Sequence, residues 1–184
     1  MLIVPLLTVA LAQSPPLGRA LTQGERAFLT PVFRDAVDYD SIRIVHGRAF
    51  PFQGGNTYVT IRDVVYAPGP LYRDDFSQAS PQRQAFLVHE VAHVWQNANG
   101  IGVLIGALRA LLVNGGRYGR AYRYDLVDGR DLLDYGIEQQ ASILEHYFLS
   151  GGQDERYSGV LRRFLEDPRY PRRLIPTPRR RARR

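Results

Sequence analysis

The sequence contains no cysteine, and this absence limits the chemistry open to the protein. Neither disulfides nor thiolate metal sites can form, so any bound metal ion must be held by nitrogen and oxygen atoms. The absence says nothing about the redox compartment in which the protein works.

Lysine is absent as well, and all 24 basic residues are arginine, a bias that a GC-rich genome explains better than a chemical role. The net charge of +6 is unevenly distributed along the chain. Residues 1–167 hold 16 arginines and all 18 acidic residues, a net charge of −2, whereas residues 168–184 hold eight arginines and no acid. We therefore expect residues 168–184 to form a disordered arginine- and proline-rich tail. Such a tail contacts an anionic surface or nucleic acid, or it only improves solubility.

No hydrophobic run is long enough to span a bilayer as a helix. Residues 1–18 form an apolar N-terminal segment in which Ala10-Leu11-Ala12 resembles a signal-peptidase site, but the segment is short and lacks a basic region. It is an atypical signal peptide, an apolar arm packed on the domain or the result of a misassigned start, so export and a cytoplasmic location both stay open. The apolar run 102–113 is expected to be a helix packed on the core, with a lid, a partner-docking helix or a membrane-surface contact as alternatives.

Residues 19–167 are expected to form one domain, because no repeat or linker divides them. The pattern predicts an α+β fold. A helix over 19–37 has Thr22 as its cap and Glu25 in a capping box, with a kink or division at Pro31. A small antiparallel sheet is expected from the segments 41–46, 57–61 and 64–66, followed by a pair of helices.

The segment His89-Glu90-Val91-Ala92-His93 has the H-E-x-x-H spacing of a catalytic zinc site. On a helix, imidazoles at i and i+4 project from the same face and can reach a single ion. Ser80 is a suitable cap for this helix, Pro81 suits its first position, and Asn99-Gly100 is a plausible stop. The alternative is a core helix that carries two hydrogen-bonded histidines.

Two histidines do not hold a catalytic metal alone, so a third ligand must come from another element. Glu138, on a second helix predicted over 134–148, is our choice, and a glutamate that only stabilises the helix N-terminus is the alternative. Glu145 lies seven residues later on the same side, as a rival ligand or a hydrogen-bond acceptor behind the ligands, and Asp134 is a further candidate. His46 and His146 are expected to be structural.

The segment 117–124 is basic and aromatic. Tyr122 and Tyr124 within it are candidates for polarising an oxyanion during hydrolysis, with packing on the surface as the alternative.

The two-helix arrangement resembles the gluzincin class of zinc metallopeptidases. A closer resemblance, over most of residues 19–149, is to bacterial Vgr-related proteins associated with type VI secretion and to the metallopeptidase-like domain of extracellular contractile injection systems. Its most specific parts are Val94-Trp95-Gln96 and Tyr135-Gly136-Ile137-Glu138-Gln139-Gln140-Ala141. The segments 19–22, 38–44 and 74–77 contribute to it, whereas the N-terminal segment and the arginine tail lie outside it.

This resemblance implies a zincin-like helix pair with one zinc ion per chain, held by His89, His93 and Glu138. Glu90 would then be the general base that takes a proton from the attacking water during peptide-bond hydrolysis. The implied partners are a peptide or protein substrate and a protein of a secretion or contractile injection system. A non-enzymatic alternative is a metal-stabilised module that docks a partner through 101–113 and the arginine tail.

Overall fold

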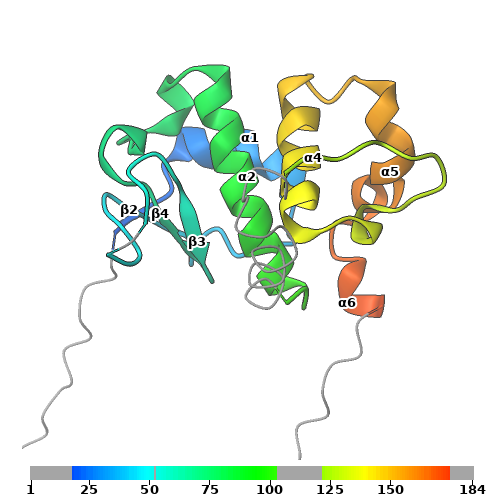
Figure 1. The fold of residues 1–184 in the computed structure, drawn as a ribbon, viewed down its shortest axis with the longest axis horizontal. Coiled ribbons are helices and arrows are strands. Elements are labelled where there is room, and N and C mark those ends of the chain that lie inside the picture. The colour runs from blue at the N-terminus through cyan, green and yellow to red at the C-terminus, as the bar shows by residue number, and fades with distance from the viewer. Residues whose placement is uncertain (1–17, 52, 103–121, 175–184) are drawn as a thin grey trace, which may run out of the picture.

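A small sheet and several helices make up residues 18–51, 53–102 and 122–174, the part of the chain that the computed structural model describes (Figure 1). The predicted α+β class is confirmed. The elements in chain order are β1 Arg19–Ala20, α1 Gln23–Phe33, β2 Arg43–Val45, β3 Val59–Ile61, β4 Val64–Tyr66, η1 Gly69–Leu71, η2 Phe76–Gln78, α2 Pro81–Ala98, η4 Leu132–Asp134, α4 Ile137–Leu149, α5 Glu155–Glu166 and α6 Pro171–Leu174.

The apolar segment before residue 18, nearly all of the apolar run 102–113 and the arginines of 175–184 lie outside the described residues. None of the described helices is both long and apolar enough to cross a membrane.

The strands form one sheet in the order β1-β2-β4-β3, and its pairing differs from the prediction. β1–β2 and β3–β4 are antiparallel, but β2 and β4 run parallel, with Ile44 opposite Val65. The sheet is therefore mixed, not antiparallel throughout. Alternation of apolar residues identifies a strand but carries no information about the direction of its neighbour. Here the β3–β4 hairpin folds on itself and then docks on β2 through its second strand.

The first helix is shorter than the predicted span of 19–37. Arg19 and Ala20 pair with β2, and α1 begins after Thr22, whose side chain forms the expected capping box with Glu25. Pro31 lies inside the helix without dividing it, and the helix ends at Phe33. Arg34 follows with a φ of 48°, a left-handed conformation that is incompatible with continuation.

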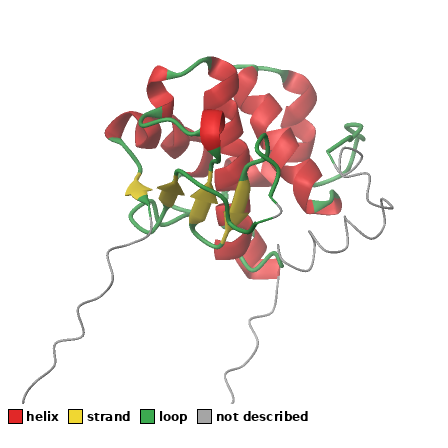
Figure 2. Cartoon of the chain, turned by 60° about the vertical axis from the view of Figure 1, so that its left-hand side comes forward, coloured by secondary structure: helices red, strands yellow, loops and turns green. Residues whose placement is uncertain are grey.

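α2 and α4 pack side by side through the middle of the molecule, with the sheet against α2 and α5 beyond α4 (Figures 1 and 2). The interior is filled by fully buried side chains from all of these elements, among them Leu29, Phe33, Ile44, Val65, Phe76, Val88, Val91, Trp95, Ile143, Leu144 and Phe164. This packing places the polar face of α2 directly opposite the first turns of α4.

Residues 168–174, expected to begin the disordered tail, pack on the domain. The Trp95 indole N–H donates to the Pro168 carbonyl at 2.7 Å, and the Tyr170 hydroxyl donates to Asp131 at 2.7 Å. Tyr170 is buried, with the Arg163 guanidinium 4.8 Å from its ring centroid. Pro168, Tyr170 and Pro171 are buried against the domain. The ordered part of the chain therefore extends into the arginine-rich segment, although its charge pattern predicted disorder.

Candidate metal centre

α2 supplies both histidines of the predicted motif. The helix runs from Pro81, capped by the Ser80 hydroxyl, to Ala98, with Asn99 at its C-terminal cap, as the sequence predicted. His89 and His93 lie one turn apart with their ring centroids 5.1 Å from each other, and each is 6% exposed. Two imidazoles are thus removed from water on one helical face.

α4 brings Glu138 to this face from its first turn. The Glu138 Oε2 atom lies 3.4 Å from His89 Nε2 and 3.4 Å from His93 Nε2. One donor atom from each of the three residues lies within 4.8 Å of the others, so the group could hold a metal ion. The structure therefore brings together the three residues that we predicted as ligands.

The donor set and its spacing fit zinc. Bonds of about 2.0–2.1 Å in a tetrahedral arrangement put neighbouring donor atoms about 3.4 Å apart, as the two imidazole–carboxylate distances are. If these two nitrogens and one oxygen held a zinc ion, they would be three protein ligands, the number typical of catalytic zinc sites.

The second ring nitrogen of each histidine has its own acceptor. His89 Nδ1 lies 3.0 Å from Glu145 Oε2, and His93 Nδ1 lies 2.9 Å from Gln96 Oε1. When Nδ1 donates to its acceptor, a neutral imidazole carries its lone pair on Nε2, on the side of Glu138, as metal binding requires. Without an ion, the Glu138 carboxylate favours a proton on that nitrogen instead. Glu145 is therefore placed behind His89 and not among the three clustered donors.

The carboxylates and imidazoles of the cluster shift each other's pKa values. Burial alone would lower the pKa of His89, but hydrogen bonds to Glu138 and Glu145 outweigh it and raise that pKa to about 10. Burial would raise the pKa of Glu138, but hydrogen bonds to both imidazoles hold it well below its usual range. Both shifts favour a positive charge between the two imidazoles and the carboxylate, and a divalent cation could supply that charge in place of a proton.

Glu90 lies beside the cluster and is held by a hydrogen bond from the sheet. The Thr60 hydroxyl on β3 donates to Glu90 Oε2 at 2.6 Å, and the residue is 7% exposed. A cavity of about 300 Å³ opens here, lined by Asn56, Thr57, Tyr58, Phe86, His89, Glu90, Tyr122 and Glu145. The carboxylate can therefore reach a molecule in this cavity.

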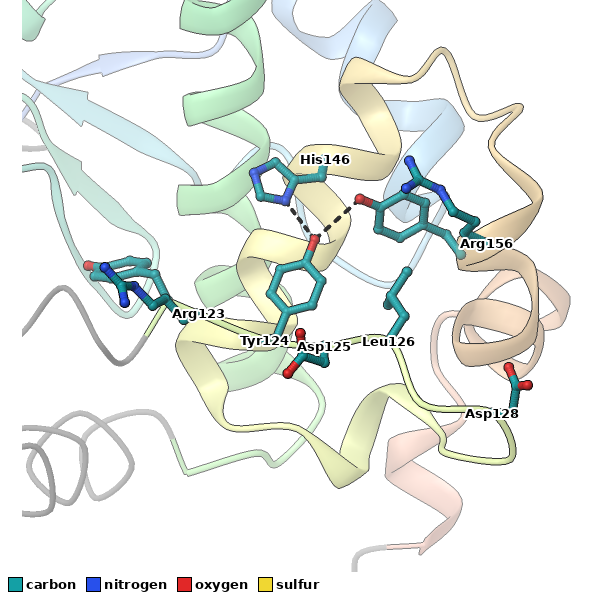
Figure 3. Close-up of a pocket in the computed structure, with 9 residues that line it drawn as sticks. Arg123, Tyr124, Asp125, Leu126, Asp128, His146 and Arg156 are labelled. Carbon is teal, nitrogen blue, oxygen red and sulfur yellow. Dashed lines mark hydrogen bonds between the residues drawn. The ribbon is translucent and has the colours of Figure 1, made fainter.

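The two tyrosines proposed to polarise an oxyanion lie in different places. The Tyr122 ring is 5.7 Å from the His89 ring and lines the cavity beside Glu90. The Tyr124 hydroxyl instead contacts His146 Nδ1 at 2.6 Å and the Tyr157 hydroxyl at 3.3 Å (Figure 3). Tyr122 is thus near the cluster, whereas Tyr124 does not line that cavity.

A second cavity of about 780 Å³ lies between residues 122–128, α4 and the start of α5. Figure 3 shows the side chains that line it. Its lining is mostly exposed and includes Arg123, Asp125, Asp128 and Arg156. It is larger than the cavity beside Glu90 but is lined by none of the three clustered donors, whereas His89 lines the smaller one. Tyr122 lines both cavities, which therefore adjoin at this side chain.

The remaining predicted residues lie away from the cluster. Asp134 accepts the Asp131 N–H in the turn before α4, and the His46 ring stacks on Tyr72 with centroids 4.4 Å apart. Sequence reasoning missed Thr60 and Gln96, which support Glu90 and His93. The i, i+3 spacing of His93 and Gln96 on one helix could have indicated the second of these contacts.

No family model matches the chain. Its sequence is 37% identical over 165 residues to the type VI secretion system spike protein VgrG2b of Pseudomonas aeruginosa. The match covers 80% of this chain but only 15% of the length of that spike protein. The structure superimposes on the effector domain of Pseudomonas aeruginosa VgrG2b with a TM-score of 0.67 and 33% identity, over 84% of this chain and 87% of that domain. The chain therefore belongs to the family of the VgrG2b effector domain.

Proposed function

We propose that the protein is a zinc-dependent metallopeptidase of gluzincin type. The observation that carries this proposal is the buried group of two imidazoles and one carboxylate on facing helices, with a separate carboxylate beside it. His89, His93 and Glu138 would hold the metal. Glu90 would not be a metal ligand, so its carboxylate could accept a proton.

Zinc, when bound, lowers the pKa of water and polarises the scissile carbonyl. Glu90 takes one proton from the attacking water as the new C–O bond forms, and delivers it to the leaving amine as the C–N bond breaks. The hydrogen bond from Thr60 to Oε2 fixes the Glu90 carboxylate, and its other oxygen would accept the proton of the attacking water. Tyr122 is the described tyrosine best placed to donate to the developing oxyanion.

β3 offers a binding surface for an extended peptide. It is an edge strand of the sheet, and its residue Thr60 contacts Glu90. A substrate that adds to this edge by main-chain hydrogen bonds would cross the cavity beside Glu90. Side chains beyond the cleaved bond would then reach the larger cavity across Tyr122. We therefore propose an unfolded or loop segment of a protein as the substrate.

The relationship to a type VI effector domain supports delivery by a secretion system as the biological setting. In that setting a spike protein of the system is the partner that carries the enzyme, and a protein of a competing cell is its target. Export by the N-terminal segment would be an alternative route out of the producing cell.

The substitution Glu90→Gln tests the mechanism. We expect it to retain zinc but to lower cleavage of unfolded casein by about 10²–10⁴-fold, because an amide cannot accept the proton of water. The same substitution at the exposed Glu155 serves as a matched control and should leave cleavage unchanged. Full cleavage by Glu90→Gln would rule out the mechanism.

A further inference from the structure

The two most specific sequence segments of the chain meet in one hydrogen-bond network. Gln96, from the Trp-Gln pair after the motif, contacts His93 Nδ1 through its Oε1 at 2.9 Å. Its Nε2 donates to the Ile137 carbonyl at 2.8 Å and to Gln140 Oε1 at 3.0 Å. Gln140 in turn donates through its Nε2 to the Tyr135 carbonyl at 2.8 Å.

Two main-chain carbonyls fix the direction of every proton in this network. A carbonyl only accepts, so the Gln140 atom that faces Tyr135 and the Gln96 atom that faces Ile137 must both be amide nitrogens. Each amide therefore turns its oxygen the other way, and Gln96 presents an acceptor to His93. An acceptor at this position requires that His93 Nδ1 carries the proton.

Loss of any hydrogen bond in this network would be destabilising, because both glutamine side chains are buried. Gln96 is fully buried and Gln140 is 3% exposed, so water does not replace a lost partner. The network also joins α2 to the turn from which Glu138 projects, since Ile137 precedes Glu138 in the chain. One side chain thus controls both the orientation of a histidine and the position of the opposite helix.

We propose that Gln96, held by Gln140, is a positioning residue for the metal: it keeps the Nε2 lone pair of His93 directed at the ion and fixes α4 so that Glu138 faces it. The inference rests on the proposed metal site. Without Gln96, the neutral His93 imidazole can carry its proton on Nε2, the nitrogen that must bind the ion. Zinc binding then has to shift the ring to the other tautomer, which weakens the observed affinity for zinc.

Zinc affinity, measured by competition with a chromophoric chelator, tests the proposal. We expect Gln96→Met to bind zinc about 10–100-fold more weakly than wild type. Gln96→Glu should bind more tightly than Gln96→Met, because a carboxylate still accepts the Nδ1 proton. The matched control is Gln84→Met, on the same helix, whose side chain donates to the Ser77 and Ala79 carbonyls instead.

The tautomer of His93 gives a second readout that a merely structural role would not move. With no zinc bound and the ring neutral, ¹⁵N shifts of the wild-type imidazole should show its proton on Nδ1, whereas in Gln96→Met both tautomers should be populated. Gln140→Met leaves the contact with His93 in place and should weaken zinc binding less than Gln96→Met does.

The outcomes separate this inference from the proposed function. If wild type binds zinc and Gln96→Met binds it equally well, the positioning role is wrong and the metal site stands. An Nδ1 proton that stays in place in Gln96→Met overturns the role as well. If wild type binds no zinc, the proposed function itself fails.

Discussion

At the scale of single residues, three glutamates are buried in the described part of the chain, and their surroundings give them different tasks. Both oxygens of Glu25 are engaged by Arg19, and the Thr22 and Phe76 N–H groups also donate to this carboxylate. Glu138 faces two imidazoles, and Glu90 receives a hydrogen bond from one hydroxyl beside a cavity. Glu25 is therefore structural, whereas the other two lie where a ligand can reach them.

Replacement of Glu25 by glutamine should lower the free energy of unfolding by about 3 kcal/mol, because it leaves the part-buried Arg19 without its charge partner. Urea denaturation at a fixed zinc concentration measures the loss. Glu155→Gln, at an exposed position, is the control and should change stability by less than about 0.5 kcal/mol. Equal stability of the two variants would contradict a structural role for the Arg19–Glu25 pair.

At the scale of elements, α2 is held between the sheet and α4, and its far end is held by the chain after α5. Trp95 is fully buried, with its ring edge-on to Phe164 at 5.1 Å and its indole N–H on Pro168. The helix that carries both histidines therefore depends on a residue 73 positions after Trp95 in the chain.

A chain that ends at Asp167 should be less stable than one that ends at Leu174 by about 3 kcal/mol, or roughly 6–12 °C in Tm. The shorter chain loses the buried ring of Tyr170 and the bonds to Trp95 and Asp131. Thermal unfolding of the two truncated proteins measures the difference. Identical melting temperatures would show that residues 168–174 contribute nothing to the fold.

At the scale of the whole molecule, the site lies where the sheet edge, α2 and α4 come together (Figure 1). β3 contributes Thr60, α2 contributes both histidines and Glu90, and α4 contributes Glu138 and Glu145. No single element holds the full set, so the site forms only when the sheet and both helices pack.

Much of this could be predicted from sequence because it depends on local spacing. The limits of α2, the capping box of α1 and the shared face of His89 and His93 each follow from a few adjacent residues. The approach of Glu138 to the two histidines was predictable because a metal site would need a third donor and the helix of Glu138 follows the motif helix. The role of Glu145 was left open, since its position behind His89 depends on how deeply α4 packs.

The features that sequence did not predict depend on contacts between distant segments. The parallel pairing of β2 and β4 is set by how a hairpin docks, and the contact of Thr60 with Glu90 joins residues 30 positions apart. The packing of Tyr170 depends on an apolar surface built by other elements, which the local charge pattern conceals.

The metal content of the purified protein tests the central claim most directly. Elemental analysis of wild type, His89→Ala and Glu138→Ala should give about one zinc ion per wild-type chain and a loss of zinc in both variants, since each removes one of three ligands. Zinc that persists in Glu138→Ala would contradict the assignment of the third ligand. No metal in wild type, under conditions that load other zinc enzymes, would contradict the metal centre itself.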